Sequence, residues 1–182
     1  GDVTRNRIPI EQYKVLVSEG KYADVAQIPD EEWEDYRTGN LWGGRDFHVW
    51  FKTRIQIPDQ FAGQPTALVI RTGYEGEWDA LNPQFLAYVN GEIVQGLDVN
   101  HRELLLTEKA KAGDVYEVYL WGYTGMHDRK SNLFTHLVTI DRELEALYYN
   151  IKVPLEIARL MEAEDKNRID ILNYLEKAVN LL

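Results

Sequence analysis

The sequence predicts a mainly β protein: an antiparallel β-sandwich followed by a helical extension at its C-terminus. Residues 47–142 contain several short apolar runs separated by turn residues, a spacing typical of sandwiches. Residues 143–182 instead repeat apolar side chains at helical spacing. We therefore expect a sandwich domain over residues 1–142, with an irregular N-terminal wrap in residues 1–46, and a helical extension over residues 143–182.

The clearest predicted strand covers residues 47–57. Apolar and polar residues alternate along it, which is the period of a strand with one face buried. The inward face is expected to carry Phe47, Val49, Phe51, Ile55 and Ile57. The outward face is expected to carry His48, Trp50, Lys52, Arg54 and Gln56.

The remaining strands are shorter and are bounded by turn signals. Between two of them lies Asn90-Gly91, a pair that favours a type I′ hairpin turn because both central residues need positive φ. Ala112-Gly113-Asp114 indicates another turn. The predicted strands cover residues 67–72, 85–89, 92–95, 103–107, 115–123 and 133–140.

Two helices are predicted in the extension. The last carries an apolar stripe at spacings of 3, 4 and 3, made by Leu172, Leu175, Val179 and Leu182. An earlier helix begins near Pro154, which suits a first turn, and residues 164–168 form a polar break. The stripe needs a partner, which is either the sandwich or a further domain beyond residue 182, and we favour the further domain.

Composition excludes several classes of function. The 182 residues carry a net charge of -10, which disfavours binding to nucleic acid or to an anionic membrane. Cysteine is absent, so disulfides, zinc–thiolate sites and thiol nucleophiles are excluded. No apolar run approaches the ~18 residues of a membrane span, and no signal peptide is evident, so we expect a cytoplasmic protein. Because residue 1 is Gly1 rather than methionine, we expect a piece of a longer protein.

No catalytic or metal-binding motif is present. The four histidines are His48, His101, His127 and His136, and none forms a His-x-Asp or His-Glu-x-x-His pattern. Gly-x-Ser-x-Gly and phosphate-loop patterns are also missing. We therefore assign no catalytic residue and no metal ligand, and we expect His48 and His136 to be structural.

Two segments are candidates for ligand contact. A gap between strands contains Glu75, Glu77, Trp78 and Asp79. An aromatic ring and carboxylates suit a sugar there, although packing is the alternative. Residues 96–103 place polar groups between two strands, and their alternative role is a tightly hydrogen-bonded connection. Trp42 precedes two glycines and is expected to fold over one end of the sandwich.

At this second segment the chain resembles a known family. Residues 88–103, with the sequence YVNGEIVQGLDVNHRE, are similar to the N-terminal β-sandwich of glycoside hydrolase family 38 α-mannosidases of the bacterial, fungal and vacuolar type. The resemblance extends from about residue 10 to residue 182. It is supported in chain order by residues 42–44 (WGG), 48–51 (HVWF), 57–58 (IP), 140–141 (ID) and 147–149 (LYY).

The resemblance implies a galactose-binding-domain-like jelly roll and a non-catalytic accessory role. In that family a separate catalytic domain binds zinc and cleaves mannosides with retention, so this chain alone would not be an enzyme and would contain no cofactor. Its partners would be that missing catalytic domain and a mannose-containing glycan. A loop lent to the substrate cleft would involve Glu75, Trp78, Asp98, Asn100, His101 and Arg102.

Three alternatives remain. The chain can be a stand-alone carbohydrate-binding module, since 5 Trp and 11 Tyr offer surfaces for sugars. It can be an interaction domain that forms homo-oligomers through its C-terminal helix. It can also be the N-terminal sandwich of a family 2 β-glycosidase, which shares the strand–Asn-Gly–strand pattern but matches residues 97–103 less well.

Overall fold

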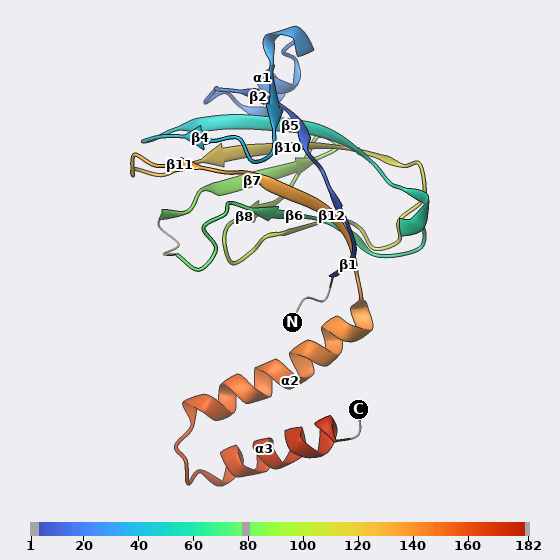
Figure 1. Cartoon of the computed structure of the whole chain (residues 1–182), viewed down its shortest axis with the longest axis vertical. Helices are drawn as coiled ribbons and strands as arrows, with labels where there is room; N and C mark the ends of the chain where they lie inside the picture. The colour runs from blue at the N-terminus through green and yellow to red at the C-terminus, as the bar shows by residue number, and fades with distance from the viewer. Residues whose placement is uncertain (1–3, 78–80, 181–182) are drawn as a thin grey trace. The chain divides into compact units, whose positions relative to one another are not determined.

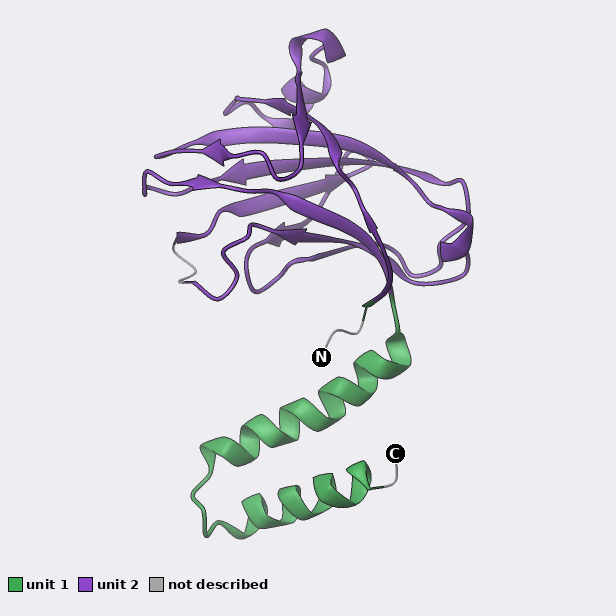
Figure 2. Ribbon diagram, viewed as in Figure 1, with its two compact units in different colours: residues 1–4, 140–182 green, residues 5–139 purple. Residues whose placement is uncertain are grey.

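The computed structural model describes residues 4–77 and 81–180 of the chain. It contains two compact units, one of residues 5–139 and one built around residues 140–180 (Figure 2). The first unit is an antiparallel jelly-roll sandwich and the second contains two helices, which confirms the predicted fold class (Figure 1).

The larger layer of the sandwich is a six-stranded sheet with the order β3-β2-β5-β10-β7-β8. Neighbouring strands in this sheet pair in antiparallel orientation. Its strands are β2 (Gln12–Leu16), β3 (Glu34–Arg37), β5 (His48–Gln56), β7 (Gln84–Val89), β8 (Glu92–Leu97) and β10 (Val115–Tyr123).

The second layer is a four-stranded sheet with the order β1-β12-β6-β9. A short third ladder joins β4 to β11 at one end of the sandwich. The strands are β1 (Thr4–Pro9), β6 (Thr66–Arg71), β9 (Glu103–Thr107), β12 (Phe134–Ile140), β4 (Trp42–Gly43) and β11 (Lys130–Ser131).

The main core lies between these two layers. Phe51 and Leu120 from the larger sheet are in one apolar cluster with Leu68, Leu104 and Leu137 from the smaller sheet. All five side chains are at most 1% exposed. The alternation predicted for residues 47–57 therefore placed its apolar face correctly. The predicted hairpin is also confirmed, since Asn90 and Gly91 have φ values of 50° and 87° between β7 and β8.

Residues 4–46 are more regular than expected. They contain β1, β2, β3 and β4, the helix α1 (Tyr22–Ala26) and the 3-10 helix η1 (Asp30–Glu32). The alternation in β2 and β3 is only four or five residues long, which is too short to be distinctive. A further 3-10 helix, η2 (Asp59–Phe61), follows β5.

A second apolar cluster lies on the outer face of the larger sheet. Val25 and Trp33, from the segment between β2 and β3, pack against Trp50, Tyr88 and Tyr119. Trp50, which the alternation placed on the outward face, is only 1% exposed. The prediction that the Trp50 side chain points outward was correct. The segment that contains α1 and η1 covers this side chain and buries it.

The second unit consists of α2 (Arg142–Leu160) and α3 (Lys166–Val179). Pro154 lies inside α2 and not in its first turn, which corrects the predicted start of that helix. Proline lacks the N–H that would bond to the carbonyl one turn earlier, yet the surrounding residues continue the helix. Arg168 donates to the carbonyls of Ala158 and Ala163 and ties the two helices together.

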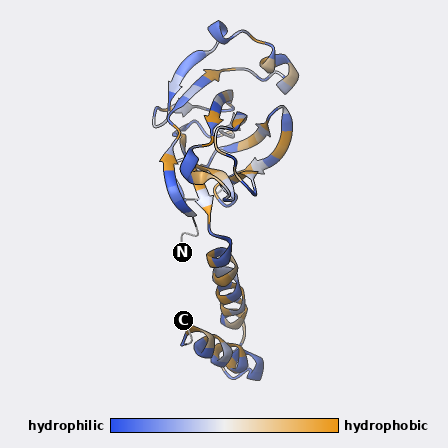
Figure 3. Cartoon of the chain, turned by 90° about the vertical axis from the view of Figure 1, so that its right-hand side faces the viewer, coloured by the Kyte–Doolittle hydropathy of each residue, from blue (hydrophilic) through white to orange (hydrophobic). Residues whose placement is uncertain are grey.

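Both helices contain apolar residues among polar ones (Figure 3). Several of these apolar residues are exposed, including Leu147, Val153, Leu160, Ile169 and Val179. Within the described residues, no helix combines the length and apolar character needed to cross a membrane.

Candidate functional site

The strand register gathers several loops at one end of the sandwich, which we call the loop end. Arg71, the last residue of β6, lies opposite Phe134, the first of β12. Tyr123 at the end of β10 lies opposite Gln84 at the start of β7. The segments 72–77, 98–102 and 124–129 therefore follow strands that finish at this end, on the left in Figure 1.

The structure brings three of the predicted site residues together at the loop end. Glu75, Asp98 and Arg102 line one small cavity with Thr72 and Phe85. Its volume is about 10 Å³, which holds at most one water molecule. These side chains meet around a space too small for a sugar.

Glu75 stabilises the turn that follows β6. Its Oε1 accepts hydrogen bonds from the backbone N–H groups of Thr72 at 2.7 Å and Gly73 at 3.3 Å. A carboxylate used in this way satisfies amides that a strand end leaves without partners. Trp78, which the sequence analysis placed beside it, lies outside the described residues.

Asp98 organises the connection between β8 and β9. Its Oδ1 accepts from the amides of Asn100 at 2.8 Å and His101 at 2.7 Å, and lies 3.2 Å from His101 Nδ1. Partial burial alone would raise the pKa of Asp98, but the hydrogen bonds from His101 and Asn100 outweigh it and hold the pKa below its usual range. His101 itself is exposed, so it reaches solvent from a fixed loop.

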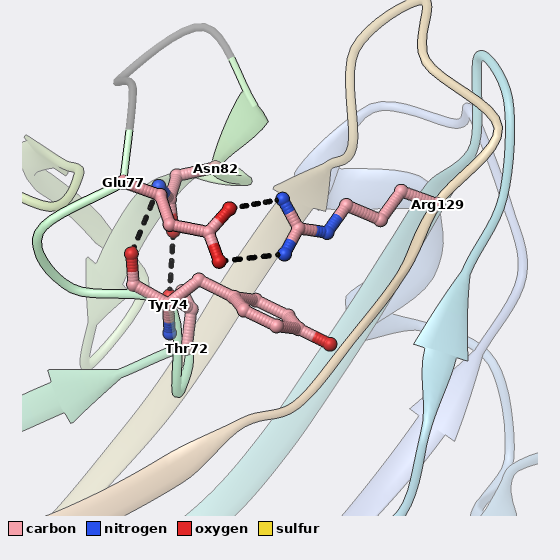
Figure 4. A network of polar contacts seen from close by, with 5 residues as sticks. All are labelled: Thr72, Tyr74, Glu77, Asn82 and Arg129. Carbon is pink, nitrogen blue, oxygen red and sulfur yellow. Dashed lines mark hydrogen bonds and ion pairs between the residues drawn. The ribbon is translucent and has the colours of Figure 1, made fainter.

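A larger polar network joins two loops that are distant in the sequence (Figure 4). Arg129 donates to both carboxylate oxygens of Glu77, at 2.6 and 3.1 Å, and its guanidinium carbon lies 3.8 Å from the Tyr74 ring centroid. Thr72 Oγ1 donates to Asn82 Oδ1 at 2.8 Å, and Asn82 Nδ2 donates to the Tyr74 carbonyl at 3.3 Å. The network fixes residues 72–77 against residues 124–129.

The role of Arg129 could not be predicted from the sequence. It lies in the charged run Asp128-Arg129-Lys130, and such a run is usually a solvated turn. Its partner Glu77 is 52 residues away in the chain. No local signal connects the two, because only the folding of β10 beside β7 brings their loops together.

Trp42 closes the loop end from the inside. It is 6% exposed and packs on Phe51 and Phe85, with ring centroids 5.2 and 5.7 Å apart. The expectation that it folds over one end of the sandwich is confirmed. Gly43 follows with a φ of 99°, and its carbonyl accepts from Lys130 Nζ across the β4–β11 ladder.

The family resemblance implies a zinc ion in a separate catalytic domain and not in this chain. The described histidines have other neighbours here. His48 stacks between Trp121 and Tyr123, and His101 contacts Asp98. Burial, with the nearby Arg7 and Arg71, lowers the pKa of His136 in β12. Residues 4–77 and 81–180 contain no group of three His, Asp or Glu side chains arranged to hold a metal ion.

We expect Arg129→Ala to raise the pKa of Glu77 toward its ordinary range. Hydrogen bonds from Arg129 hold that pKa low, against a smaller effect of burial. A carboxyl group with a lowered folded-state pKa stabilises the fold above its unfolded-state pKa, and this contribution is lost as the pH falls through the folded-state value. The variant should therefore be less stable than the parent at neutral pH, and this difference should shrink in acid, where only the contact of Arg129 with Tyr74 is lost.

Carboxyl ¹³C NMR titration and urea unfolding at both pH values measure these effects. Arg37→Ala is the matched control, because Arg37 pairs with Glu11 elsewhere on the sandwich. An unchanged Glu77 titration in Arg129→Ala would contradict the role of the guanidinium.

Solved structures of other proteins share this fold, and a family model matches the sequence. A β-glucuronidase from Ruminococcus gnavus superposes on the chain with a TM-score of 0.53 and has 10% sequence identity over 77% of this chain. A glycosyl hydrolase family 2 member from Bacteroides cellulosilyticus superposes with a TM-score of 0.51 and has 15% identity over 73% of this chain. The matches span 30% and 20% of those chains.

At these identities the structural likeness shows the fold alone. No protein of curated function matches the sequence significantly. The family model described as "Alpha-mannosidase, jelly roll domain" matches residues 8–126, which is most of the sandwich. The chain therefore belongs to the family of α-mannosidase jelly-roll domains.

Proposed function

We propose that this chain is the non-catalytic accessory domain of a zinc-dependent retaining α-mannosidase and that its loop end borders the substrate cleft. The observation that carries the proposal is the family match over residues 8–126, which includes Glu75, Asp98 and Arg102. In the sandwich Glu75, Asp98 and Arg129 hold the loops in one conformation. Loops fixed on a rigid scaffold are suited to shape a site made by another domain.

The partner in this proposal is the catalytic domain of the same protein. The exposed apolar residues of α2 and α3 support it, because isolated stripes of this kind are normally covered in a folded protein. The catalytic domain would also supply the zinc ligands. The residues described here would then brace that domain and position a mannose-containing glycan, without touching the reacting atoms.

Turnover measurements on two proteins test this function. The 182-residue chain should release no nitrophenol from p-nitrophenyl α-mannoside, with or without zinc, whereas the longer protein that contains it should do so only with zinc. In that longer protein, Arg129→Ala should lower kcat/KM about tenfold by loosening the loop end. Arg37→Ala, which removes an arginine that pairs with Glu11 elsewhere on the sandwich, is the control and should have no effect.

Three results would contradict the proposal. Hydrolysis by the 182-residue chain would show that it carries its own catalytic groups. Absence of zinc-dependent α-mannosidase activity in the longer protein would contradict the proposed substrate. Equal kcat/KM for Arg129→Ala and Arg37→Ala would contradict the proposed position of the loop end beside the substrate cleft.

A further inference from the structure

A groove crosses the outer face of the six-stranded sheet, away from the loop end. Its volume is about 430 Å³, within the range of about 300–1,000 Å³ that is typical of small-ligand sites. β2, β5 and β10 form its base, and residues of η1 and β3 form one wall. Six charged side chains line it: Lys14, Asp30, Asp35, Lys52, Arg54 and Glu117.

Two lysines are held in place at the base of the groove. Lys14 and Lys52 are directly opposite in the pairing of β2 and β5, an arrangement that is unfavourable for like charges without counter-ions. Lys14 Nζ lies 2.8 Å from Asp35 Oδ1, and Lys52 Nζ lies 2.5 Å from Asp30 Oδ1. Lys52 also lies over the Trp33 ring at 4.2 Å and is 12% exposed, so its ammonium group is already fixed.

The other two charged groups have no side-chain partner in the described part of the chain. Arg54 and Glu117 are opposite each other in the register of β5 and β10. No hydrogen bond or ion pair joins the Arg54 guanidinium or the Glu117 carboxylate to another residue there, although Glu117 uses its backbone groups to pair with Asn90. A guanidinium donor and a carboxylate acceptor therefore face the groove unused.

An aromatic residue lies beside this pair. Tyr119 lines the groove and is 4% exposed, packed between Trp33 and Tyr22. Burial, with a smaller contribution from Glu117, raises the pKa of Tyr119 to about 12. Tyr119 adds an uncharged aromatic side chain to the lining of the groove.

We propose that this groove binds a neutral oligosaccharide, as a site separate from the loop end. Its three cations and three anions balance, so a charged ligand would meet as much repulsion as attraction, and the net charge of -10 disfavours polyanions further. A sugar hydroxyl both donates and accepts, and it can bond to a guanidinium and a carboxylate at once. The inference does not rest on the proposed enzyme role.

NMR titration of the ¹⁵N-labelled 182-residue chain tests this site. The probes are α-1,2-mannobiose, maltose and cellobiose, with glucuronate and inorganic phosphate as charged comparisons. At least one neutral disaccharide should shift the amides of Lys14, Arg54 and Glu117 at ~10 mM. Arg54→Ala should weaken that binding about tenfold, because it removes charge-assisted hydrogen bonds. Glu117→Gln should weaken it too.

Arg71→Ala is the matched control, since it removes an exposed strand arginine from the other sheet and should leave binding unchanged. Thermal melting checks that each variant folds. If Arg54→Ala does not fold, the site is tested with Glu117→Gln, which keeps the side-chain size. The proposal is overturned if neutral sugars shift no groove amide, if shifts are confined to residues 72–77 and 98–102, or if glucuronate or phosphate binds the groove more tightly.

Discussion

Replacing Phe51 by alanine is expected to lower the free energy of unfolding by about 3–5 kcal/mol, the range for a large aromatic residue lost from a core. Phe51 is 0% exposed in the middle of β5. Its ring makes edge contacts with Tyr36 and Trp42, with centroids 4.9 and 5.2 Å apart, and with Tyr13 at 6.4 Å. Alanine would leave a cavity that three rigid rings cannot close.

Urea unfolding followed by tryptophan fluorescence measures this loss. The control is Ile93→Ala, which removes a side chain 63% exposed on the edge strand β8 and should change stability by less than about 0.5 kcal/mol. Similar losses in both variants would mean that the main core does not lie between the two sheets at β5.

Gly43→Ala is expected to cost about 3 kcal/mol or more, because two effects combine there. The φ of Gly43 is 99°, a conformation that residues with a Cβ rarely adopt. A Cβ at this position would also lie 2.6 Å from Thr124 Cγ2 and 3.3 Å from the Arg129 carbonyl oxygen. The β4–β11 ladder and the loop carrying Arg129 would have to move.

Gly113→Ala separates these two effects. Gly113 has a φ of 83°, but a Cβ there would meet nothing within 4 Å. It should therefore lose only about 1 kcal/mol from backbone strain. Thermal unfolding compares the variants, and NMR spectra of the Arg129 side chain report the loop end. If both variants lose the same stability, the close packing of Gly43 against Thr124 is not a constraint.

The site residues were only partly accessible from the sequence. Asp98 and its neighbours stood out because Asp and Asn fix turns through bonds to nearby amides, and these bonds are local. Glu75 was predicted to contact a sugar because it lies in a loop with an aromatic residue and other carboxylates. In the structure its carboxylate accepts hydrogen bonds from backbone amides two and three residues before it. Composition indicates which groups are present in a loop, but not whether they face a ligand or the loop itself.

The sequence by itself determined the sandwich class, the inward face of β5, the hairpin at Asn90-Gly91 and the presence of helices after residue 141, since alternation, turn chemistry and helical spacing are properties of neighbouring residues. Only the tertiary structure decided the strand order, the cover over Trp50, the contact of Arg129 with Glu77, and the groove in which Arg54 faces Glu117. Each of these depends on which distant segments lie side by side. The pairing of distant segments is determined by the burial of whole sheets, which cannot be predicted from a short stretch of sequence.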